Sequence, residues 1–357
     1  MRFVPASCLR DGMQVAKPLY GKNNEKLLAV GVVLNSKYID SIQRLKYPGI
    51  YIEDDISRDI DIMSVISDEL RVETMKGVKR IFLDAKSGAS RKEKVEEIRL
   101  MVESIVEELL INKHLMINMI DLKCFDNYTY SHSVNVAVLS LVMGIAMELD
   151  RETLWKLGLS AVLHDIGKVF IDKSIINKPD VLTPAEFEEI KKHSLLGYEY
   201  ARKKFRLPTS SYTGIRDHHE KYNGTGYPAA KSGKSISLFG RIITLADIYD
   251  ALSSERPYRK ALCPSEAMEF IMGNIETVFD PKIAEIFIRK VAPYPVGTLV
   301  RLSSGDTAIV VENFEACCLR PKVRVINSGG KDVSPYDLNL FNDYSLLNIV
   351  IEGPVKE

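Results

Sequence analysis

The feature that most limits how this chain can fold is the placement of its histidines. Five of the six histidines fall between positions 132 and 219, and three of them stand in two adjacent pairs, His164-Asp165 and His218-His219. The first pair follows an apolar run over residues 157–163. Burying an imidazole beside a carboxylate is costly unless the groups are paired with each other or bind a metal. The sequence therefore predicts a buried polar centre in the middle of the chain.

The spacing of these residues favours a helical bundle. The steps from one member to the next are 25 to 32 residues along His132, His164, His193 and His218, and from His219 to Asp247. Each step is long enough for the chain to leave a centre along one helix and return to it along the next, so several helices can bring their side chains to one centre. Successive residues on a helix point about 100° apart. We therefore expect the adjacent histidines 218 and 219 to serve two metals, or one metal and a substrate phosphate, rather than one shared metal.

The types of side chain indicate the chemistry. Imidazoles and carboxylates without thiolates suit iron, manganese or zinc, and geometry decides among them. Two such metals about 3.5–4 Å apart would bridge a hydroxide and clamp a phosphodiester. The set therefore indicates metal-assisted phosphoester hydrolysis. The sixth histidine, His114, lies outside the set, and we expect no metal role for it.

Charge and composition limit the partners and the compartment. Lys and Arg number 48 and Asp and Glu number 48, so a net charge of zero disfavours a broad grip on a nucleic acid polymer. The sequence has no run of 18 apolar residues and its first 13 residues lack a secretory signal, so we expect no membrane span. The five cysteines form no CxxC pair, which fits a reducing cytoplasm best.

Patterns along the chain divide it into four segments. We predict a small α+β domain over 1–60, a helical linker over 61–109, a catalytic helical domain over 110–294 and a small β-rich extension over 295–357. Strands are expected at 27–34 and 49–52 and, near the end, at 298–302, 308–311 and 322–326. Helices are expected at 36–45, 131–149, 154–163 and 184–203, the last one capped by Thr183. The helical segment 62–121 would suit a homodimer.

The order of these residues along the chain resembles the motifs of a known family. The order His132, His164-Asp165 and Asp247 is similar to the HD superfamily of metal-dependent phosphohydrolases, which folds as a helical bundle. The extended set resembles the HD-GYP subfamily, because the chain has His164 to Lys168, His193, His218-His219-Glu220, Gly224 to Pro228, Asp247 to Leu252 and Arg256 to Arg259. The resemblance covers about residues 110–292, a little over half of the chain, and it implies a mainly α fold with an HD-GYP catalytic domain.

The resemblance implies hydrolysis of cyclic di-GMP to pGpG, with a second cut to GMP left open, by a hydroxide that bridges two metals. Iron is the implied metal, with manganese as the alternative. The implied ligands, with Asp165 as the bridge, are His132, His164, Asp165, His193, His218, His219 and Asp247. Asp165 and Lys168 are the implied catalytic residues. The implied substrate contacts are Lys168, Tyr227, Asp250, Arg256 and Arg259.

Two points stay open at this stage. Turn chemistry around Tyr227 fits a structural loop as well as a substrate-binding one. Some family members carry a Glu one helical turn before the first ligand histidine and hold a third metal. Tyr128 occupies that position here, and because a phenol is a poor substitute for a bridging carboxylate at neutral pH, we expect two metals.

Two other functions remain as alternatives to the cyclic di-GMP phosphodiesterase. The first is a catalytically weak module that binds cyclic di-GMP and signals through contacts. The second is an HD phosphohydrolase that acts on another nucleotide. Every ligand position of a two-metal site is filled, which argues against the binding module. The loop from Gly224 to Pro228 and the segment from Arg256 to Arg259 are not required by the metal chemistry, and they argue against a different nucleotide.

Overall fold

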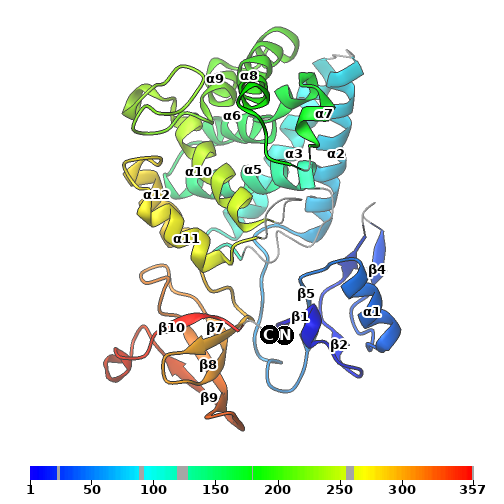
Figure 1. Cartoon of the computed structure of the whole chain (residues 1–357), viewed down its shortest axis with the longest axis vertical. Helices are drawn as coiled ribbons and strands as arrows, with labels where there is room; N and C mark the ends of the chain where they lie inside the picture. The colour runs from blue at the N-terminus through cyan, green and yellow to red at the C-terminus, as the bar shows by residue number, and fades with distance from the viewer. Residues whose placement is uncertain (22–24, 88–91, 119–127, 179, 255–260, 356–357) are drawn as a thin grey trace.

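The structure, a computed structural model, describes residues 1–21, 25–87, 92–118, 128–178, 180–254 and 261–355. A bundle of helices forms the upper part in Figure 1, and two small β-rich parts, one from each end of the chain, lie below it. The predicted fold class, mainly α with small sheets near both ends, is therefore confirmed.

The N-terminal part packs one helix on an antiparallel sheet of order β1-β5-β2. Its elements are β1 (Arg2–Pro5), β2 (Gln14–Val15), β3 (Leu19–Tyr20), β4 (Lys26–Leu28), α1 (Ser36–Arg44) and β5 (Gly49–Glu53). Helix α1 begins at Ser36 because the Asn35 side chain caps it by accepting a hydrogen bond from the Tyr38 backbone N–H. The predicted strand 27–34 is wrong beyond Leu28, since Gly31, with φ at +85°, turns the chain there.

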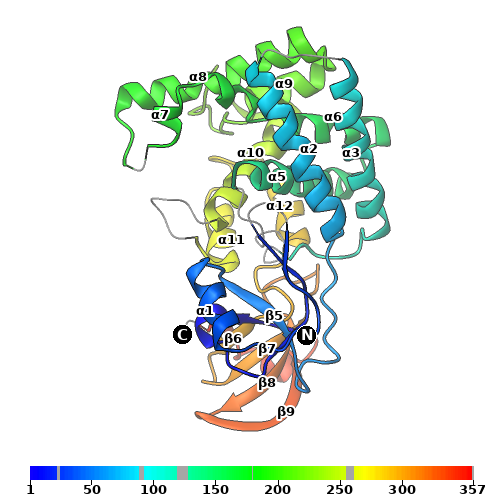
Figure 2. The same ribbon diagram turned by 90° about the vertical axis from the view of Figure 1, so that its right-hand side faces the viewer.

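The helical bundle has one continuous hydrophobic core. Its helices are α2 (Asp68–Ser87), α3 (Lys92–Ile111), α5 (Tyr128–Ala146), α6 (Arg151–Val162), α7 (Lys173–Ile176), α8 (Pro184–Tyr200), α9 (Thr209–Asp217), α10 (Leu238–Ser253), α11 (Pro264–Gly273) and α12 (Pro281–Lys290). Figure 2 shows α2 and α3 lying along the bundle, where α2 contacts α5 and α3 contacts α6. Residues of α2 and α3, in the segment predicted as a linker, thus belong to the same core as the helices that follow.

Helix α5 is the centre of the bundle. Residues 131–144 are all buried, as expected for a helix that is apolar on nearly every side. Helix α8 begins as predicted, because the Thr183 hydroxyl accepts from the Glu186 backbone N–H while the Glu186 carboxylate accepts from that of Thr183. It ends at Tyr200, and residues 201–205 continue as a π-helical turn, so the predicted helix 184–203 is in two pieces.

The C-terminal part is a five-stranded antiparallel sheet of order β10-β6-β7-β8-β9. Its strands are β6 (Leu299–Leu302), β7 (Thr307–Glu312), β8 (Lys322–Ser328), β9 (Lys331–Asn339) and β10 (Ile351–Pro354), so the three predicted strands are confirmed. Strand β9 was not predicted, because it lies at the edge of the sheet with most residues exposed and shows no alternation of apolar and polar side chains. This sheet packs on the N-terminal part, since Tyr51, Ile60 and Ile309 share one core cluster.

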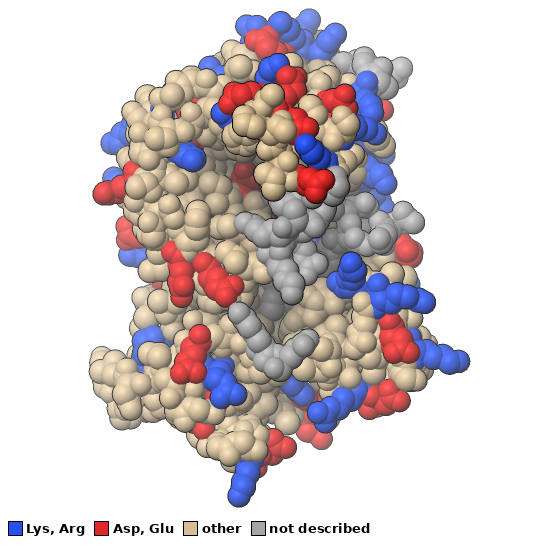
Figure 3. Space-filling model, viewed as in Figure 1, with Lys and Arg blue, Asp and Glu red and all other residues tan. Residues whose placement is uncertain are grey.

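The surface carries no broad region of one charge on the face drawn in Figure 3, where Lys and Arg are interspersed with Asp and Glu. The same face is hollowed in its upper, helical part. Within the described ranges, no helix is both long enough and apolar enough to cross a membrane.

Candidate metal centre

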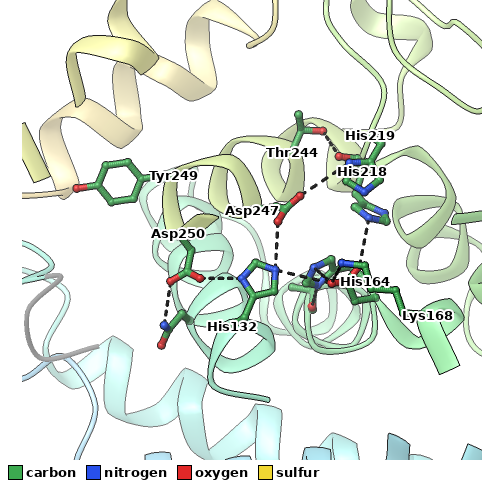
Figure 4. A network of polar contacts seen from close by, with 12 residues as sticks. His132, His164, Lys168, His218, His219, Thr244, Asp247, Tyr249 and Asp250 are labelled. Carbon is green, nitrogen blue, oxygen red and sulfur yellow. Dashed lines mark hydrogen bonds and ion pairs between the residues drawn. The ribbon is translucent and has the colours of Figure 1, made fainter. Parts of the chain in front are cut away.

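Seven potential metal ligands, all predicted from the sequence, meet at one buried centre (Figure 4). They come from five places in the bundle: the start of α5, the end of α6, the middle of α8, the end of α9 and the middle of α10. The residues, in chain order, are His132, His164, Asp165, His193, His218, His219 and Asp247.

The ligand atoms form two groups. His132, His164 and Asp247 offer one atom each, and these atoms lie within 4.8 Å of one another. Asp165, His193, His218 and His219 make a second group by the same measure. Each group has nitrogen and oxygen donors in the number that a transition metal uses from a protein.

The carboxylate of Asp165 lies between the two groups. Its Oδ2 is 3.4 Å from His164 Nε2 and 3.8 Å from His132 Nε2. Its Oδ1 is 3.5 Å from His193 Nε2 and 3.9 Å from His218 Nε2. One oxygen therefore faces each group, which is the arrangement that a bridging carboxylate needs.

Two buried atoms at this centre make no hydrogen bond. They are His164 Nε2 and Asp165 Oδ1, in side chains that are 0% and 2% exposed. Leaving a buried polar atom without a partner costs about 1–3 kcal/mol, and such atoms in native proteins are explained by strain, catalysis or an ion. An imidazole nitrogen and a carboxylate oxygen that face the same point fit a divalent metal ion.

Backbone hydrogen bonds turn the histidine rings toward the centre. In His164, His193 and His218, Nδ1 lies 2.6–2.7 Å from the carbonyl oxygen of the residue three positions earlier. Only a protonated Nδ1 can donate to a carbonyl, so Nε2 keeps its lone pair and points inward. This pairing of a ligand ring with an outer acceptor is the usual support of metal-binding histidines.

Asp250 supports the ligand His132. Its side chain is fully buried, its Oδ2 accepts from His132 Nδ1 at 2.7 Å, and its Oδ1 accepts from Asn135 Nδ2 at 2.9 Å. Both carboxylate oxygens are thus used inside the protein. The geometry gives Asp250 a role in supporting His132, and the substrate contact expected from the sequence stays a prediction.

Burial keeps most of the histidines neutral. It lowers the pKa of His193 to about 4 and that of His218 to about 3, and it holds the pKa of His219 well below the ordinary value. At neutral pH these rings have free lone pairs for a metal. Burial also lowers the pKa of His132, but hydrogen bonds to Asp247 and Asp250 outweigh it and raise the pKa to about 9.

The two carboxylates of the centre stay ionised. Burial raises the pKa of Asp165, but the Lys168 ammonium and the neighbouring His164 lower it more, so the pKa lies well below the ordinary value. Burial likewise opposes the charge on Asp247, and the hydrogen bond with His132 more than offsets it and keeps that pKa low. These two carboxylates are therefore deprotonated at neutral pH, as metal binding requires of them.

The adjacent histidines 218 and 219 belong to the same group. Helix α9 ends at Asp217, directly before the two residues, and their ring centroids are 4.0 Å apart. Their nitrogens lie with those of His193 and the carboxylate of Asp165. The expectation that one metal would not take both is therefore wrong.

Lys168 and Tyr227 lie at the edge of the centre. Lys168 Nζ is 2.5 Å from Asp165 Oδ2, and its side chain is 36% exposed, so it connects the carboxylate with the solvent side. The Tyr227 ring packs on His219, with centroids 4.7 Å apart. Arg256 and Arg259 lie outside the described residues, as does the side chain of Tyr128 at the start of α5.

A role that the sequence did not reveal belongs to Glu220. This buried carboxylate accepts hydrogen bonds from the backbone N–H groups of Ala229 and Lys231, at 2.8 and 3.0 Å, and so holds the loop that carries Tyr227. Gly226 permits the close approach of this loop, because an added Cβ would lie 2.3 Å from the Lys221 backbone nitrogen. The only signal in the sequence was its position, since Glu220 directly follows the histidine pair 218 and 219.

The comparison with protein families agrees with this geometry. The family model described as "HD domain" matches residues 114–283, which include every ligand of both groups. This part of the chain is an HD domain. Helices α2 and α3 lie before the matched part of the HD domain, although they share its core.

Curated relatives of the HD domain are bacterial phosphodiesterases. A cyclic di-GMP phosphodiesterase of Pseudomonas aeruginosa is 35% identical over 65% of this chain and 56% of its own length. A 3'3'-cGAMP-specific phosphodiesterase of Vibrio cholerae is 39% identical over 43% of this chain and 34% of its own. The matches thus span less than two thirds of each relative. A solved structure described as a HDG"Y"P protein from Bdellovibrio bacteriovorus is 17% identical over 80% of this chain and 97% of its own, with a TM-score of 0.49.

Proposed function

We propose that this protein is a metal-dependent phosphodiesterase that hydrolyses cyclic di-GMP to linear pGpG. The observation that carries the proposal is the Asp165 carboxylate, which directs one oxygen to each of two buried ligand groups. Two metals held a few ångströms apart are the usual device for in-line displacement at a phosphodiester. The names of relatives such as the Pseudomonas aeruginosa enzyme support the substrate.

The residues of this chain divide the work between two metal sites. In our proposal, His132, His164 and Asp247 hold one divalent metal and His193, His218 and His219 hold the other, with Asp165 shared. Iron is the proposed metal, with manganese as the alternative, because the donors are imidazoles and carboxylates. When bound, such metals act as Lewis acids and make water nucleophilic at neutral pH. Tyr128 in place of a carboxylate supports two metals rather than three.

Other residues bind and orient the substrate. The Lys168 ammonium, half-exposed beside Asp165, is positioned to donate to a phosphoryl oxygen and to offset the charge that develops on it. The Tyr227 ring, packed on His219, forms an aromatic wall against which a purine can stack. We propose phosphate or guanine contacts for Arg256 and Arg259, whose forked donors suit both groups. Hydrolysis breaks one phosphorus–O3′ bond and gives pGpG, and a second cut of pGpG gives GMP.

A second candidate substrate has a specific basis. The relative that is 39% identical is named for 3'3'-cGAMP, a cyclic dinucleotide with one adenine in place of a guanine. The metal ligands act on the phosphodiester, which the two substrates share, so the choice between them depends on contacts to the bases. Of the cysteines, Cys8, Cys263, Cys317 and Cys318 are free thiols, which supports our proposal that the protein works in the cytoplasm.

The test is a product analysis with matched variants. Anaerobically purified protein is loaded with ferrous iron or manganese, its metal content is measured, and cyclic di-GMP and 3'3'-cGAMP are supplied in parallel. We expect about two metals per chain and pGpG from cyclic di-GMP, no product from Asp165→Ala, and full turnover by His114→Ala, which changes an exposed histidine away from the centre.

Other results would change the assignment. Bound cyclic di-GMP without product would favour the binding module, and turnover of 3'3'-cGAMP alone would move the substrate. Neither binding nor turnover of either compound would point to an HD phosphohydrolase for another nucleotide. Three metals per chain would refute the argument from Tyr128. A homodimer through residues 62–121 remains a prediction, which light scattering at micromolar concentration checks.

A further inference from the structure

A buried arginine outside the matched HD domain is connected to the metal centre. Arg71 belongs to α2, and its side chain is only 1% exposed, although arginine is almost never fully buried unless it is paired. Its Nη1 donates a 3.1 Å hydrogen bond to Oδ1 of Asn135, a buried residue of α5. Asn135 stands three residues after the ligand His132, on the same side of α5.

The donors and acceptors that connect Arg71 with Asn135 and Asp250 can be assigned in only one way. A guanidinium has donors and no acceptor, so the Asn135 oxygen must face Arg71. The amide NH2 of Asn135 then faces Asp250 and donates to its Oδ1 at 2.9 Å. The other Asp250 oxygen accepts from His132 Nδ1 at 2.7 Å, as Figure 4 shows, which directs Nε2 of His132 to the centre.

We propose that Arg71 is a positioning residue for the metal ligand His132 and acts through Asn135 and Asp250. The inference rests on the proposed metal-dependent function. Without the guanidinium, the buried Asn135 oxygen loses the Arg71 donor that helps to fix the position of the amide. The bond from the Asn135 NH2 to Asp250 then weakens, and with it the hold of Asp250 on the ring of His132.

The proposal gives helix α2 a role at the centre. Residues 114–283 form the matched HD domain, and Arg71 reaches its first ligand from a helix that precedes it. A buried cation also balances the charge of the fully buried Asp250 carboxylate, two hydrogen bonds away. Displacement of α2 would therefore change the support of the metal ligand His132.

The test measures metal binding and not only turnover. Mn²⁺ affinity is determined for the full chain by titration against a chelating dye, and the bound ions are followed by electron paramagnetic resonance. We expect Arg71→Met to weaken one of the two Mn²⁺ sites about tenfold, the low end of what loss of an outer partner costs, and to leave the other unchanged. Asn135→Ala, which breaks the same chain of bonds from α5, should weaken the same site.

A matched control separates positioning from packing. Val78 is fully buried on the same helix and takes no part in these hydrogen bonds, so Val78→Ala should lower the melting temperature and leave both affinities unchanged. In a double-mutant cycle, Arg71→Met should add nothing to the loss in Asp250→Asn, because both act on His132 through the same carboxylate.

The outcomes are distinguishable. Wild-type protein that binds neither Mn²⁺ nor Fe²⁺ would refute the proposed function itself. Wild-type protein with two Mn²⁺ ions and an Arg71→Met variant with unchanged affinities would refute only the positioning role. Losses that multiply in the Arg71→Met, Asp250→Asn double variant would also overturn it, since the two residues would then act independently.

Discussion

The substitution Gly167→Ala tests how closely the backbone around the centre is packed. Gly167 lies in the turn after Asp165, against the middle of α8. A Cβ added there would lie 1.9 Å from the His193 carbonyl oxygen and 2.6 Å from the Gly197 backbone nitrogen. These neighbours are backbone atoms of a helix, so no side-chain rotation can relieve the clash.

The size of the disturbance follows from these distances. Ordinary contact with a Cβ begins at 3.4 Å, so the turn and α8 must separate locally by 1.5 Å. The turn follows Asp165 and α8 carries His193, and metal–ligand distances vary by only about 0.2 Å in a working site. We therefore expect at least about a tenfold loss of affinity for the metal held by His193. Overpacking should also cost about 1–3 kcal/mol, or about 2–12 °C in melting temperature.

The assay combines Mn²⁺ titration with thermal unfolding and uses two alanine variants for comparison. An added Cβ at Gly273, at the end of α11, meets nothing within 4 Å, so Gly273→Ala should leave both quantities unchanged. Gly197→Ala brings its Cβ to 3.1 Å from the Ile215 side chain and should have an intermediate effect. A Gly167→Ala protein with wild-type Mn²⁺ affinity would refute the reasoning that this backbone contact sets the distance between Asp165 and His193.

Two further predictions concern the loop that carries Tyr227 and an ion pair between the N-terminal and C-terminal parts. Glu220→Gln places an amide NH2 against a backbone donor, so we expect about 1–3 kcal/mol lower stability in urea and a higher KM for the cyclic dinucleotide with the metal content unchanged; an unchanged KM would show that the loop does not bind substrate. Arg324 forms a forked pair with Asp59, and its hydrogen bonds lower the pKa of that carboxyl to about 2. Because the folded-state pKa lies below the unfolded value of about 3.9, the stabilisation is complete above that value and is lost as the pH falls toward 2. Asp59 is 65% exposed, so Asp59→Asn should cost no more than about 1 kcal/mol in urea at pH 6 and less at pH 3, and an equal cost at both pH values would contradict the ion pair.

Much of the centre followed from local patterns. Histidines and aspartates that end or interrupt apolar helical runs have few ways to be buried, so their identity and spacing indicated all seven grouped ligands. The start of α8 was equally readable, because a capping box depends on two residues that are three positions apart. Two errors came from extending local rules too far. Helical spacing was assumed for the histidine pair after Asp217, where α9 has already ended, and a strand was extended through a turn at Gly31.

The sequence by itself determined which side chains could bind metal and which segments would be helical, because both depend on residue type and on neighbours within one or two turns. Only the tertiary structure decided which ligands share a group, that each oxygen of Asp165 faces a different group, and that Asp250 points inward. It alone brought Arg71 to Asn135, 64 positions away, and Asp250 to His132, 118 positions away. Contacts of that range depend on how whole helices pack, and the periodicity of a single helix carries no information about the partner that will cover each face.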